Sequence, residues 1–565
     1  MQLALVGLLL ALAGAADKPS EPAPVPSGMD LLYGDQVAFA PNGEPIVAVG
    51  LASGEPRLRM SAASAMQLDF YEHGTLKRAS VQAGQSIEIT LVRSTPATRS
   101  YYVDIEGVRF GDSVALERVL GGWRARGYAD VKAVEEGLVL GLYGRVLDNR
   151  EYRVTLASAS AAQAARLTSR LFELFGTRAT VKSRLRDRPW GELAIKAGGA
   201  PLGLATSYVR LRAPAGPFAL EHVEFAKGYS WHGFEDRRYK GELYIVVDPS
   251  GALAAVNVLG VEAMLESVVP SEMFAGSPSE ALKAQAIAAR NHLLAKLGRR
   301  HHDDPFHICA DQHCQVYGGL GYEDPRTTEA VRATYGEVLF HSGVLVESVY
   351  SSSCGGYTED NDAVWGDVPN PALRARPDFD VATHPELSPF AGGISNANVG
   401  AWLMAKPETY CAKASRARAD RQRWTRSFRG AELDTLLERD HAALGHLRDL
   451  VVEERGPGGR VVSLQLVGSK SSESIVHELP IRQLFGNLNS GAFVVELERA
   501  ASGDITLATF RGGGWGHGVG MCQIGAIGRA EAGHGYRQIL AHYYNGATVQ
   551  QLYLAPSAEV SRGVR

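Results

Sequence analysis

One glutamate in the middle of the chain stands where a carboxyl group could do acid chemistry. Glu272 lies in the segment VVPSEMF, just before the run Ser277-Pro278-Ser279-Glu280. Apolar neighbours such as Val269 and Met273 can raise the pKa of a carboxyl group towards neutrality, so that it can act as a general acid. Taken alone, a glutamate beside a helix start is more often a solvated or capping carboxylate.

Thiol and imidazole groups are concentrated in the segment HHDDPFHICADQHC. Thiolate and imidazole ligands at such short spacing suit zinc. In an oxidising compartment a Cys309–Cys314 disulfide is the alternative, and the sequence leaves both open. The residues concerned are His301, His302, His307, Cys309, His313 and Cys314.

A glycine-rich segment, GGGWGHGVGMCQIGA, spans residues 512–526. Glycines permit positive φ angles and close approach of the backbone to a ligand. His517 and Gln523 could therefore face a bound ligand, and Trp515 could stack on it. For His517, a turn inside a packed core is an equally good interpretation.

The chain has five cysteines, an odd number, so at least one thiol is left for a metal, a partner or neither. Cys354 and Cys522, which belong to two different segments, could form a disulfide. The turn Thr358-Glu359-Asp360 is a second acidic group. Such turns are usually solvated, and a supporting role in an active site stays open.

Two helices must position Glu272. We expect a short helix from Val261 to Val268, because the residue before Pro270 disfavours the α region. We expect a second helix with Ser277 as N-cap, Pro278 in the first turn and Gly298 at its end. This places Glu272 in the loop between them, near the positive end of the second helix. The expected apolar face of the second helix is Leu282, Ala286, Ala289 and Leu293.

These segments occur in an order that resembles a known family. VVPSEM…ALKAQAIAAR is similar to the signature of the SpoIID/LytB family of stage II sporulation protein D and amidase enhancers. FHICADQHCQVYGG, TYGEVLFHSGVLVESVYSSSCGGYTEDNDAVWG, RGPGGRV with LPIRQLFG, and GGGWGHGVGMCQIGAIGRAEAG follow in order. The resemblance covers residues 230–552, which is over half of the chain.

The resemblance implies a peptidoglycan lytic transglycosylase in which Glu272 is the general acid and base. Such an enzyme uses the 6-hydroxyl of the sugar instead of water and leaves 1,6-anhydro-N-acetylmuramic ends, so one carboxyl group can donate and then accept a proton. It also implies that the preferred substrate is peptide-stripped glycan.

The resemblance further implies a structural zinc held by Cys309, Cys314 and His302 or its neighbour His301, with no cofactor in catalysis. From the matching segments we expect the following residues to contact the substrate: Ser271, Gln315, Tyr317, Gly355, Gly356, Trp515, His517 and Gln523. A cell-wall amidase is the protein partner that the family's second name suggests.

The pattern of the remaining sequence indicates further domains. Tyr101-Val103-Ile105 and Tyr152-Val154-Leu156 alternate as strands, each followed by leucines at helical spacing. This internal repeat indicates a small ferredoxin-type domain and resembles a SPOR module, which binds peptidoglycan. We expect a multidomain α+β fold: a signal peptide (residues 1–16), a linker (17–29), a β-rich region (30–99), the SPOR-like domain (100–190), a β-rich connection (191–229), a mixed SpoIID-type catalytic domain (230–552) and a tail (553–565).

The N-terminus and the composition limit which compartment and which partners we expect. Leu3 to Leu12 is apolar and Ala13-Gly14-Ala15 is a cleavage-like site, so we expect export to the periplasm, envelope or exterior. After that segment no apolar run is long enough to span a membrane. With 58 Lys+Arg against 62 Asp+Glu, the net charge of −4 disfavours nucleic-acid binding.

Two rival functions remain open. A non-catalytic protein could bind peptidoglycan and enhance a separate amidase, although a pure binder has no need of an acid at Glu272. A zinc-dependent amidase fits less well, because a cysteine-rich ligand set is typical of a closed structural site.

Overall fold

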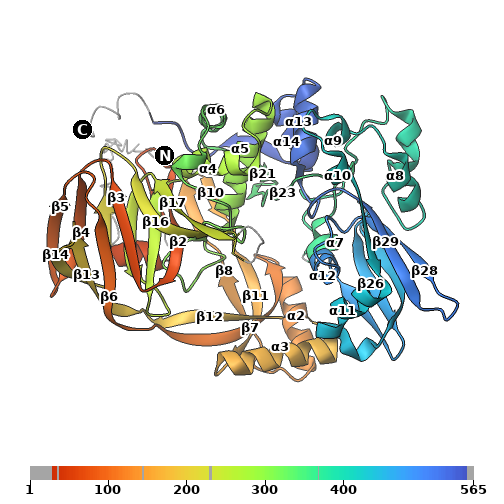
Figure 1. Ribbon diagram of the computed structural model, residues 1–565, viewed down its shortest axis with the longest axis horizontal. Helices are drawn as coiled ribbons and strands as arrows, with labels where there is room; N and C mark the ends of the chain where they lie inside the picture. Colours follow the sequence, from red (N-terminus) through yellow and green to blue (C-terminus); the bar gives the residue numbers. More distant parts are fainter. Residues whose placement is uncertain are drawn as a thin grey trace, which may run out of the picture.

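The computed structural model describes residues 28–34, 37–142, 145–177, 179–227, 232–366 and 368–556. The expected signal peptide, most of the linker and the last part of the tail lie outside these residues. In Figure 1 a β-rich half stands on the left, a small α/β unit lies below, and the C-terminal half stands on the right. None of the helices in the described residues is long and apolar enough to cross a membrane.

Two sheets build the β-rich half around one apolar core. Alternating exposure along β4 and β3 puts every second side chain into this core. The first sheet contains β1 (Ala38–Phe39), β2 (Pro45–Glu55), β4 (Met66–Glu72), β5 (Thr75–Val81), β15 (Tyr208–Arg212), β18 (Glu242–Val247), β19 (Leu253–Gly260) and β20 (Ile308–Cys309). The second contains β3 (Arg57–Ala62), β6 (Ile87–Thr95), β13 (Trp190–Ala197), β14 (Ala200–Thr206), β16 (Phe218–Phe225) and β17 (Gly233–Tyr239).

These sheets cross two of the expected boundaries. Strands before residue 99 and after residue 191 share both sheets, and β16 pairs with β17 across residue 230. The β-rich regions and the start of the expected catalytic domain therefore form one unit. Periodicity alone could not show this, because strand pairing over such distances leaves no local signal.

The internal repeat forms a βαββαβ unit inserted into this half. Its antiparallel sheet has the order β12-β7-β11-β8, with α2 and α3 on one face (Figure 1), which is the ferredoxin-type arrangement. Val103, Leu120 and Leu171 lie in its core as the spacing predicts, whereas Leu174 is exposed. The elements are β7 (Thr98–Arg109), α2 (Ser113–Ala125), β8 (Lys132–Glu136), β9 (Val139–Leu142), β10 (Arg145–Asp148), β11 (Glu151–Ser158), α3 (Ala161–Phe175) and β12 (Thr180–Asp187).

The insert leaves and re-enters the second sheet at neighbouring positions. Thr95 at the end of β6 pairs with Trp190 at the start of β13. The insert also contacts the helices that follow the sheets: the side-chain amide of Asn149 donates to the carbonyls of Leu294, Ala295 and Leu297 at 3.3, 3.2 and 2.9 Å. The inserted unit thus satisfies carbonyl groups at the C-terminal end of the helix Ser279–Lys296.

Two helices, α4 (Val261–Glu272) and α5 (Ser279–Lys296), follow the sheets. Helix α4 does not end before Pro270 but runs through it, and the Met273 amide still donates to the Val269 carbonyl at 2.9 Å. In the last turn a proline costs only one hydrogen bond, which explains why the rule fails here. Pro278, not Ser277, occupies the N-cap of α5.

Helix α5 is buried on nearly all sides, including the expected apolar face. A buried ion pair joins it to α4: Arg290 donates to both carboxylate oxygens of Glu262 at 2.7 and 2.6 Å. Tyr553 near the C-terminus donates to the same carboxylate at 2.6 Å. This ion pair fixes α4, which ends at Glu272, against α5.

The C-terminal half has its own core and short sheets. Its strands, with those that join it to the helices, are β21 (Glu337–His341), β22 (Val344–Leu345), β23 (Tyr350–Ser351), β24 (Arg423–Arg429), β25 (Leu447–Arg455), β26 (Val461–Gly468), β27 (Ser472–Val476), β28 (Phe493–Arg499), β29 (Ile505–Gly513), β30 (Met521–Cys522) and β31 (Thr548–Gln551). The other helices are α1 (Gly28–Tyr33), α6 (Pro325–Ala333), α7 (Asn361–Trp365), α8 (Val399–Ala405), α9 (Tyr410–Lys413), α10 (Ala419–Gln422), α11 (Gly430–His441), α12 (Glu478–Leu484), α13 (Gln523–Glu531) and α14 (Tyr536–Tyr543).

Candidate functional site

Glu272 is the last residue of α4, not a loop residue. Burial raises the pKa of its carboxyl group to about 7, and nearby polar side chains and Lys296 lower it less than burial raises it. The carbonyl groups at a helix C-terminus also disfavour a negative charge. A carboxyl group with this pKa is partly protonated at neutral pH, as a general acid must be.

A short parallel strand pair brings two partners to Glu272 from distant segments. Tyr350 of β23 pairs with Met521 of β30, and Gln523 follows β30 directly. The Tyr350 hydroxyl lies close enough to the Glu272 carboxyl group to lower its pKa. Gln523 donates from Nε2 to the Glu272 carbonyl at 2.9 Å and to Gln285 at 3.4 Å. Gln523 thus lies at the site, where it orients the end of α4.

His517 lies behind Tyr350. The amide of Val519 donates to Nδ1 at 3.0 Å, so Nε2 carries the proton and donates to the Tyr350 carbonyl at 3.0 Å. Burial and the charge of Arg460 lower the pKa of His517 to about 3. A neutral ring with both nitrogens engaged positions Tyr350, which agrees with the packed-turn interpretation.

Two tryptophans border this histidine with part of their surface free. Trp365 and Trp515 are each 37% exposed, and the Trp365 ring lies 5.1 Å from the His517 ring. The guanidinium of Arg421 lies 4.9 Å from the Trp515 ring. Partly exposed indole faces of this kind suit the stacking of a sugar ring. Trp515 was expected from the sequence and Trp365 was not.

Of four other expected contact residues, three are buried and Ser271 is partly buried. Tyr317 is 2% exposed and donates to Asn257 at 2.8 Å, and Ser271 donates back to the Ser267 carbonyl at 2.9 Å. Gly355 and Gly356 are buried with φ of 72° and 102°, which only glycine adopts readily. The structure therefore gives these four a structural position, because matching a motif does not tell core from surface.

Gln315 stands one layer behind the acid. It is buried and donates from Nε2 to the Tyr350 hydroxyl at 3.2 Å. His292 lies near the same tyrosine, with ring centroids 5.7 Å apart. Burial and nearby cations lower the pKa of His292 well below its usual range, so the ring is neutral. Sequence reasoning missed Tyr350 and His292, although Tyr350 lies in one of the matching segments.

The Cys309 segment folds into a compact group of donors. Cys309, Cys314, His301 and His313 offer ligand atoms that all lie within 4.8 Å of one another. The His313 Nδ1 atom is 3.6 Å from each sulfur, and both cysteines are free thiols. Neighbouring nitrogen and sulfur ligands of a tetrahedral zinc are about 3.6 Å apart. The donor set therefore fits zinc.

Of the adjacent residues His301 and His302, only His301 belongs to this group. The Nε2 atom of His301 is 3.0 Å from the Cys314 sulfur, and its Nδ1 hydrogen-bonds to Asp304 at 2.8 Å. His302 points instead to Glu136 of the insert, at 3.8 Å. Adjacent residues in an irregular segment face different directions, and spacing alone could not choose between them.

Glu359 of the acidic turn is fully buried and holds a loop. Its carboxylate accepts hydrogen bonds from the amides of Gly458 and Arg460 at 2.9 and 3.0 Å. Burial raises its pKa. The loop that it holds packs against the glycine-rich segment, since an added Cβ at Gly518 would meet Arg460.

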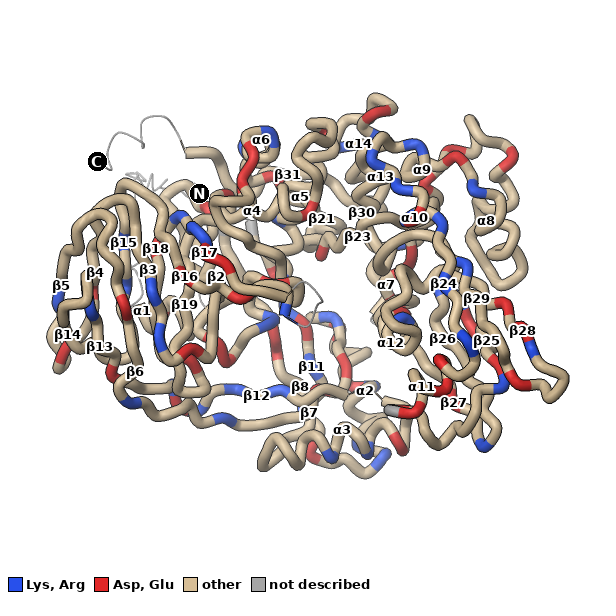
Figure 2. Tube along the Cα trace, in the orientation of Figure 1, with Lys and Arg blue, Asp and Glu red and all other residues tan. Residues whose placement is uncertain are grey.

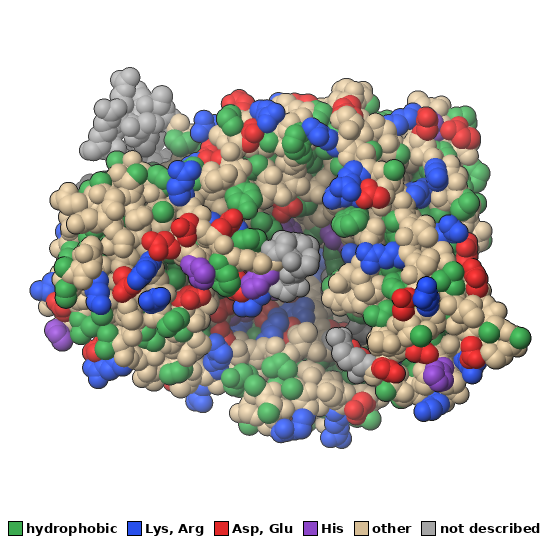
Figure 3. Space-filling model, viewed as in Figure 1, with side chains coloured by type: hydrophobic (Ala, Val, Ile, Leu, Met, Phe, Trp, Pro, Cys, Tyr) green, Lys and Arg blue, Asp and Glu red, His purple; other side chains and the backbone are tan. Residues whose placement is uncertain are grey.

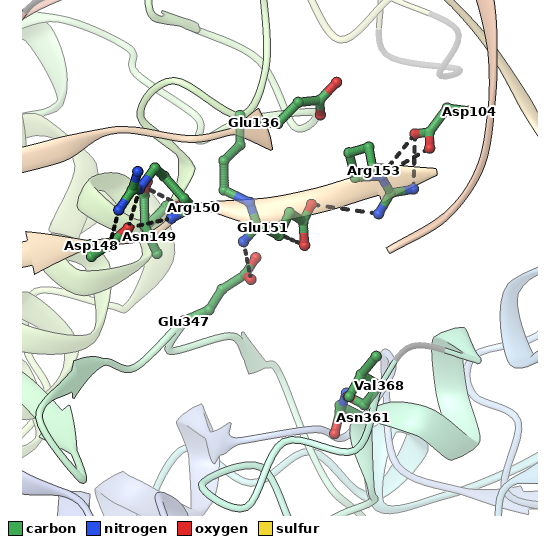
Figure 4. A network of polar contacts seen from close by, with 12 residues as sticks. Asp104, Glu136, Asp148, Asn149, Arg150, Glu151, Arg153, Glu347, Asn361 and Val368 are labelled. Atoms are coloured by element: carbon green, nitrogen blue, oxygen red, sulfur yellow. Dashed lines mark hydrogen bonds and ion pairs between the residues drawn. The ribbon is translucent and has the colours of Figure 1, made fainter. Parts of the chain in front are cut away.

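A hollow opens between the β-rich half and the C-terminal half (Figure 3). In Figure 2, β8 and β11 of the insert, which contain charged residues, lie on one side of the central opening, and α7 and α12 lie on the other side. In the close view, Glu151 and Arg153 of β11 lie across the opening from Asn361 and Val368 (Figure 4). Arg299, which follows α5, bridges Glu151 and Glu347 at 2.5 and 3.3 Å.

Comparison with known proteins gives two matches to families. Residues 249–341 match the family described as Stage II sporulation protein, and residues 359–520 match a domain of unknown function (DUF8618). The first match contains α4, α5 and the zinc-type donor group, and the second contains the tryptophans.

Three curated relatives each align with 50% to 58% of the chain. An amidase enhancer of Bacillus subtilis is 30% identical over 299 residues, which is 50% of this chain and 40% of that protein. An uncharacterized protein of Brachyspira hyodysenteriae is 26% identical over 58% of this chain and 75% of its own length. Stage II sporulation protein D of Bacillus subtilis is 27% identical over 53% of this chain and 76% of its own length. Residues 249–341 of the chain thus form a domain of the SpoIID family.

Proposed function

We propose that the protein cleaves peptidoglycan glycan strands as a lytic transglycosylase. The observation that carries this proposal is the partly buried carboxyl group of Glu272 at the end of α4, whose pKa is raised to about 7. Glu272 protonates the glycosidic oxygen as the bond from C1 breaks. The resulting carboxylate accepts the proton of the 6-hydroxyl, whose oxygen attacks C1 and closes a 1,6-anhydro ring.

The surroundings of Glu272 suit a mechanism with one carboxyl group. Glycoside hydrolases pair two carboxyl groups to activate water or to form a covalent intermediate. The groups that shift the pKa of Glu272 are Tyr350, Gln523 and Lys296, and none is acidic. Intramolecular attack by the sugar needs no second base, because Glu272 returns to its protonated form at the end.

Product analysis tests this proposal. We expect the purified protein to release fragments with 1,6-anhydro-N-acetylmuramic ends, detected by mass spectrometry, and to act faster on amidase-treated sacculi than on intact sacculi. Reducing ends made by hydrolysis would contradict the transglycosylase mechanism. Equal rates on the two kinds of sacculi would contradict only the preference for peptide-free strands.

The pH profile should follow the protonation of Glu272. The reaction needs the protonated acid, and the protonated fraction falls as pH rises through about 7, so kcat/KM should fall about tenfold per pH unit above that value. The Tyr350 hydroxyl lowers the pKa, so Tyr350→Phe should move the fall to higher pH. A fall at the same pH in both proteins would separate Tyr350 from the acid.

We propose that His301, Cys309, His313 and Cys314 hold a structural zinc. Bound there, zinc would tie the segment after α5 to itself, and no step of the reaction passes through it. Metal analysis should find that Cys309→Ser loses this zinc and melts at a lower temperature, because structural zinc contributes to folding. His302→Ala is the matched control and should keep the metal. Zinc loss in the control alone would reverse the ligand assignment.

We propose that the insert helps to hold the glycan strand beside the hollow. Because Thr95 pairs with Trp190, residues 97–188 can be replaced by a two-residue turn that closes β6 and β13 as a hairpin. The shortened protein should bind amidase-treated sacculi more weakly while it still cleaves short soluble glycans. Equal binding would make the insert a spacer.

A second candidate is a non-catalytic enhancer of a cell-wall amidase, since one relative is named an amidase enhancer. This function would tolerate loss of the acid. Addition of Glu272→Gln protein to an amidase assay separates the two: stimulation equal to that of the wild type favours the enhancer. Export completes the proposal, and N-terminal sequencing of the secreted protein would locate the cleavage expected near Ala15.

A further inference from the structure

A second group of sulfur atoms lies in the core of the C-terminal half. Cys354 follows β23, Cys411 lies in α9 and Cys522 ends β30, and these thiols are 3%, 0% and 1% exposed. Asp378, with no exposed surface, points at the same place. One ligand atom from each of the four lies within 4.8 Å of all the others.

The spacing of these atoms is that of metal ligands and not of a disulfide. The Cys354 sulfur is 3.8 Å from the Cys411 sulfur and 3.8 Å from Oδ2 of Asp378. A disulfide needs about 2.05 Å between sulfurs. Ligands about 2.3 Å from a tetrahedral zinc lie about 3.8 Å apart for two sulfurs and about 3.6 Å apart for sulfur and oxygen. The disulfide expected between Cys354 and Cys522 is absent, and all three are free thiols.

Hydrogen bonds already hold the donors in place. Oδ1 of Asp378 accepts from the Tyr543 hydroxyl at 2.8 Å and from Arg529 at 3.2 Å, while the Cys411 amide donates to Oδ2 at 3.0 Å. These bonds fix the carboxylate with one oxygen towards the sulfurs. Such outer contacts are typical of ligating carboxylates.

The sulfur atom of Cys522 is oriented by the backbone. The amides of Cys354 and Gly525 both donate to it at 3.2 Å, and Cys522 is the N-cap of α13. Amide groups directed at sulfur, at the positive end of a helix, stabilise a thiolate. A neutral buried thiol needs no such arrangement.

Charge around the group is also suited to a cation with anionic ligands. Three thiolates and a carboxylate with Zn²⁺ would carry a net charge of about −2. The buried guanidinium of Arg529 contacts Asp378, and the largely buried Arg423 lies close enough to the sulfurs of Cys354 and Cys411 to interact with their charge. These two cations offset that charge.

We propose that Cys354, Asp378, Cys411 and Cys522 form a second, fully buried structural zinc site. Ser351 and Cys522 pair across β23 and β30, the strands that place Tyr350 and Gln523 beside Glu272. An ion at this point would join α9 to both strands. It would thereby hold the glutamate's two partners in register, without contact with substrate.

Zinc counting on the full-length protein tests the site independently of glycan cleavage. We expect about two zinc ions per chain in the wild type, about one in Cys309→Ser, about one in Cys411→Ser and none in the double variant. The zinc remaining in Cys309→Ser belongs to the new site whatever happens at the first. If Cys309→Ser keeps no zinc while its other thiols are free, or if its mass shows a disulfide, the proposal fails.

X-ray absorption of the unmutated protein covers the case in which a variant does not fold. The two donor groups together hold five cysteine sulfurs, two in the first and three in the second. Filled sites would therefore give a mean of about 2.5 sulfur ligands per zinc. A mean of two sulfurs with one zinc per chain would restrict zinc to the first group and overturn the proposal.

Discussion

Glu272→Gln should lower the rate of glycan cleavage roughly 100- to 10,000-fold. Glutamine has nearly the same size, but it cannot deliver a proton to the leaving oxygen. The measurement is release of 1,6-anhydro ends from amidase-treated sacculi at pH 6, where the Glu272 acid is largely protonated because its pKa is about 7. The variant should bind the same sacculi as the wild type does.

Glu266→Gln is the matched control on the same helix. Glu266 forms ion pairs with Lys240 and Arg332 at 2.6 and 3.1 Å on the outer side of α4. Its loss should leave the rate within a few-fold of the wild type, because partly exposed ion pairs contribute little. Wild-type cleavage by Glu272→Gln, or equal losses in both variants, would remove Glu272 from the chemistry.

Arg290→Met should destabilise the protein by about 3–5 kcal/mol, because it leaves the Glu262 carboxylate buried without its cation. Neither side chain has appreciable exposure, with side-chain values of 0% and 7%. Arg290 also donates to the Glu337 carbonyl at 2.9 Å. Denaturant unfolding followed by tryptophan fluorescence would measure the change.

A double-mutant cycle sharpens that measurement. Glu262→Gln combined with Arg290→Met removes both charges and should be less destabilised than the sum of the single variants. Additive losses would show that the ion pair does not couple α4 to α5. The pair would then be no explanation for the position of Glu272.

The sequence was enough to single out Glu272 but not to predict its environment. Glu272 stands in a continuous motif, and so do the cysteines of the first donor group. Tyr350 and Gln523 meet only because β23 and β30 pair over more than 150 residues of chain, and such pairing has no local signature. The sequence predicted an apolar face for α5, but not that almost every side of this helix is buried.

Errors at single residues have similar physical causes. Pro270 was expected to end α4, yet near the C-terminus a helix tolerates a proline, since only one bond is lost. Tyr317 was expected at the substrate, yet it lies against Tyr239 in the core, with ring centroids 5.5 Å apart. His302 or its neighbour His301 was expected among the metal ligands, and only His301 lies in the donor group. In each case the motif identified the segment. For Tyr317 and His302, packing decided which way the side chain points.

The way in which the insert is attached has a consequence for the products. Asn149 binds the carbonyls at the end of α5, and Gly137 donates to the Gly298 carbonyl at 3.0 Å, so the insert is docked on the helix that packs against α4. A module on a loose linker lets the strand be cut at any position. A glycan strand held by this docked unit would be cut at a fixed number of sugars from the point where it is held. The glycan fragments would then cluster around one length. Loss of the contacts between the insert and α5 would broaden this distribution of lengths.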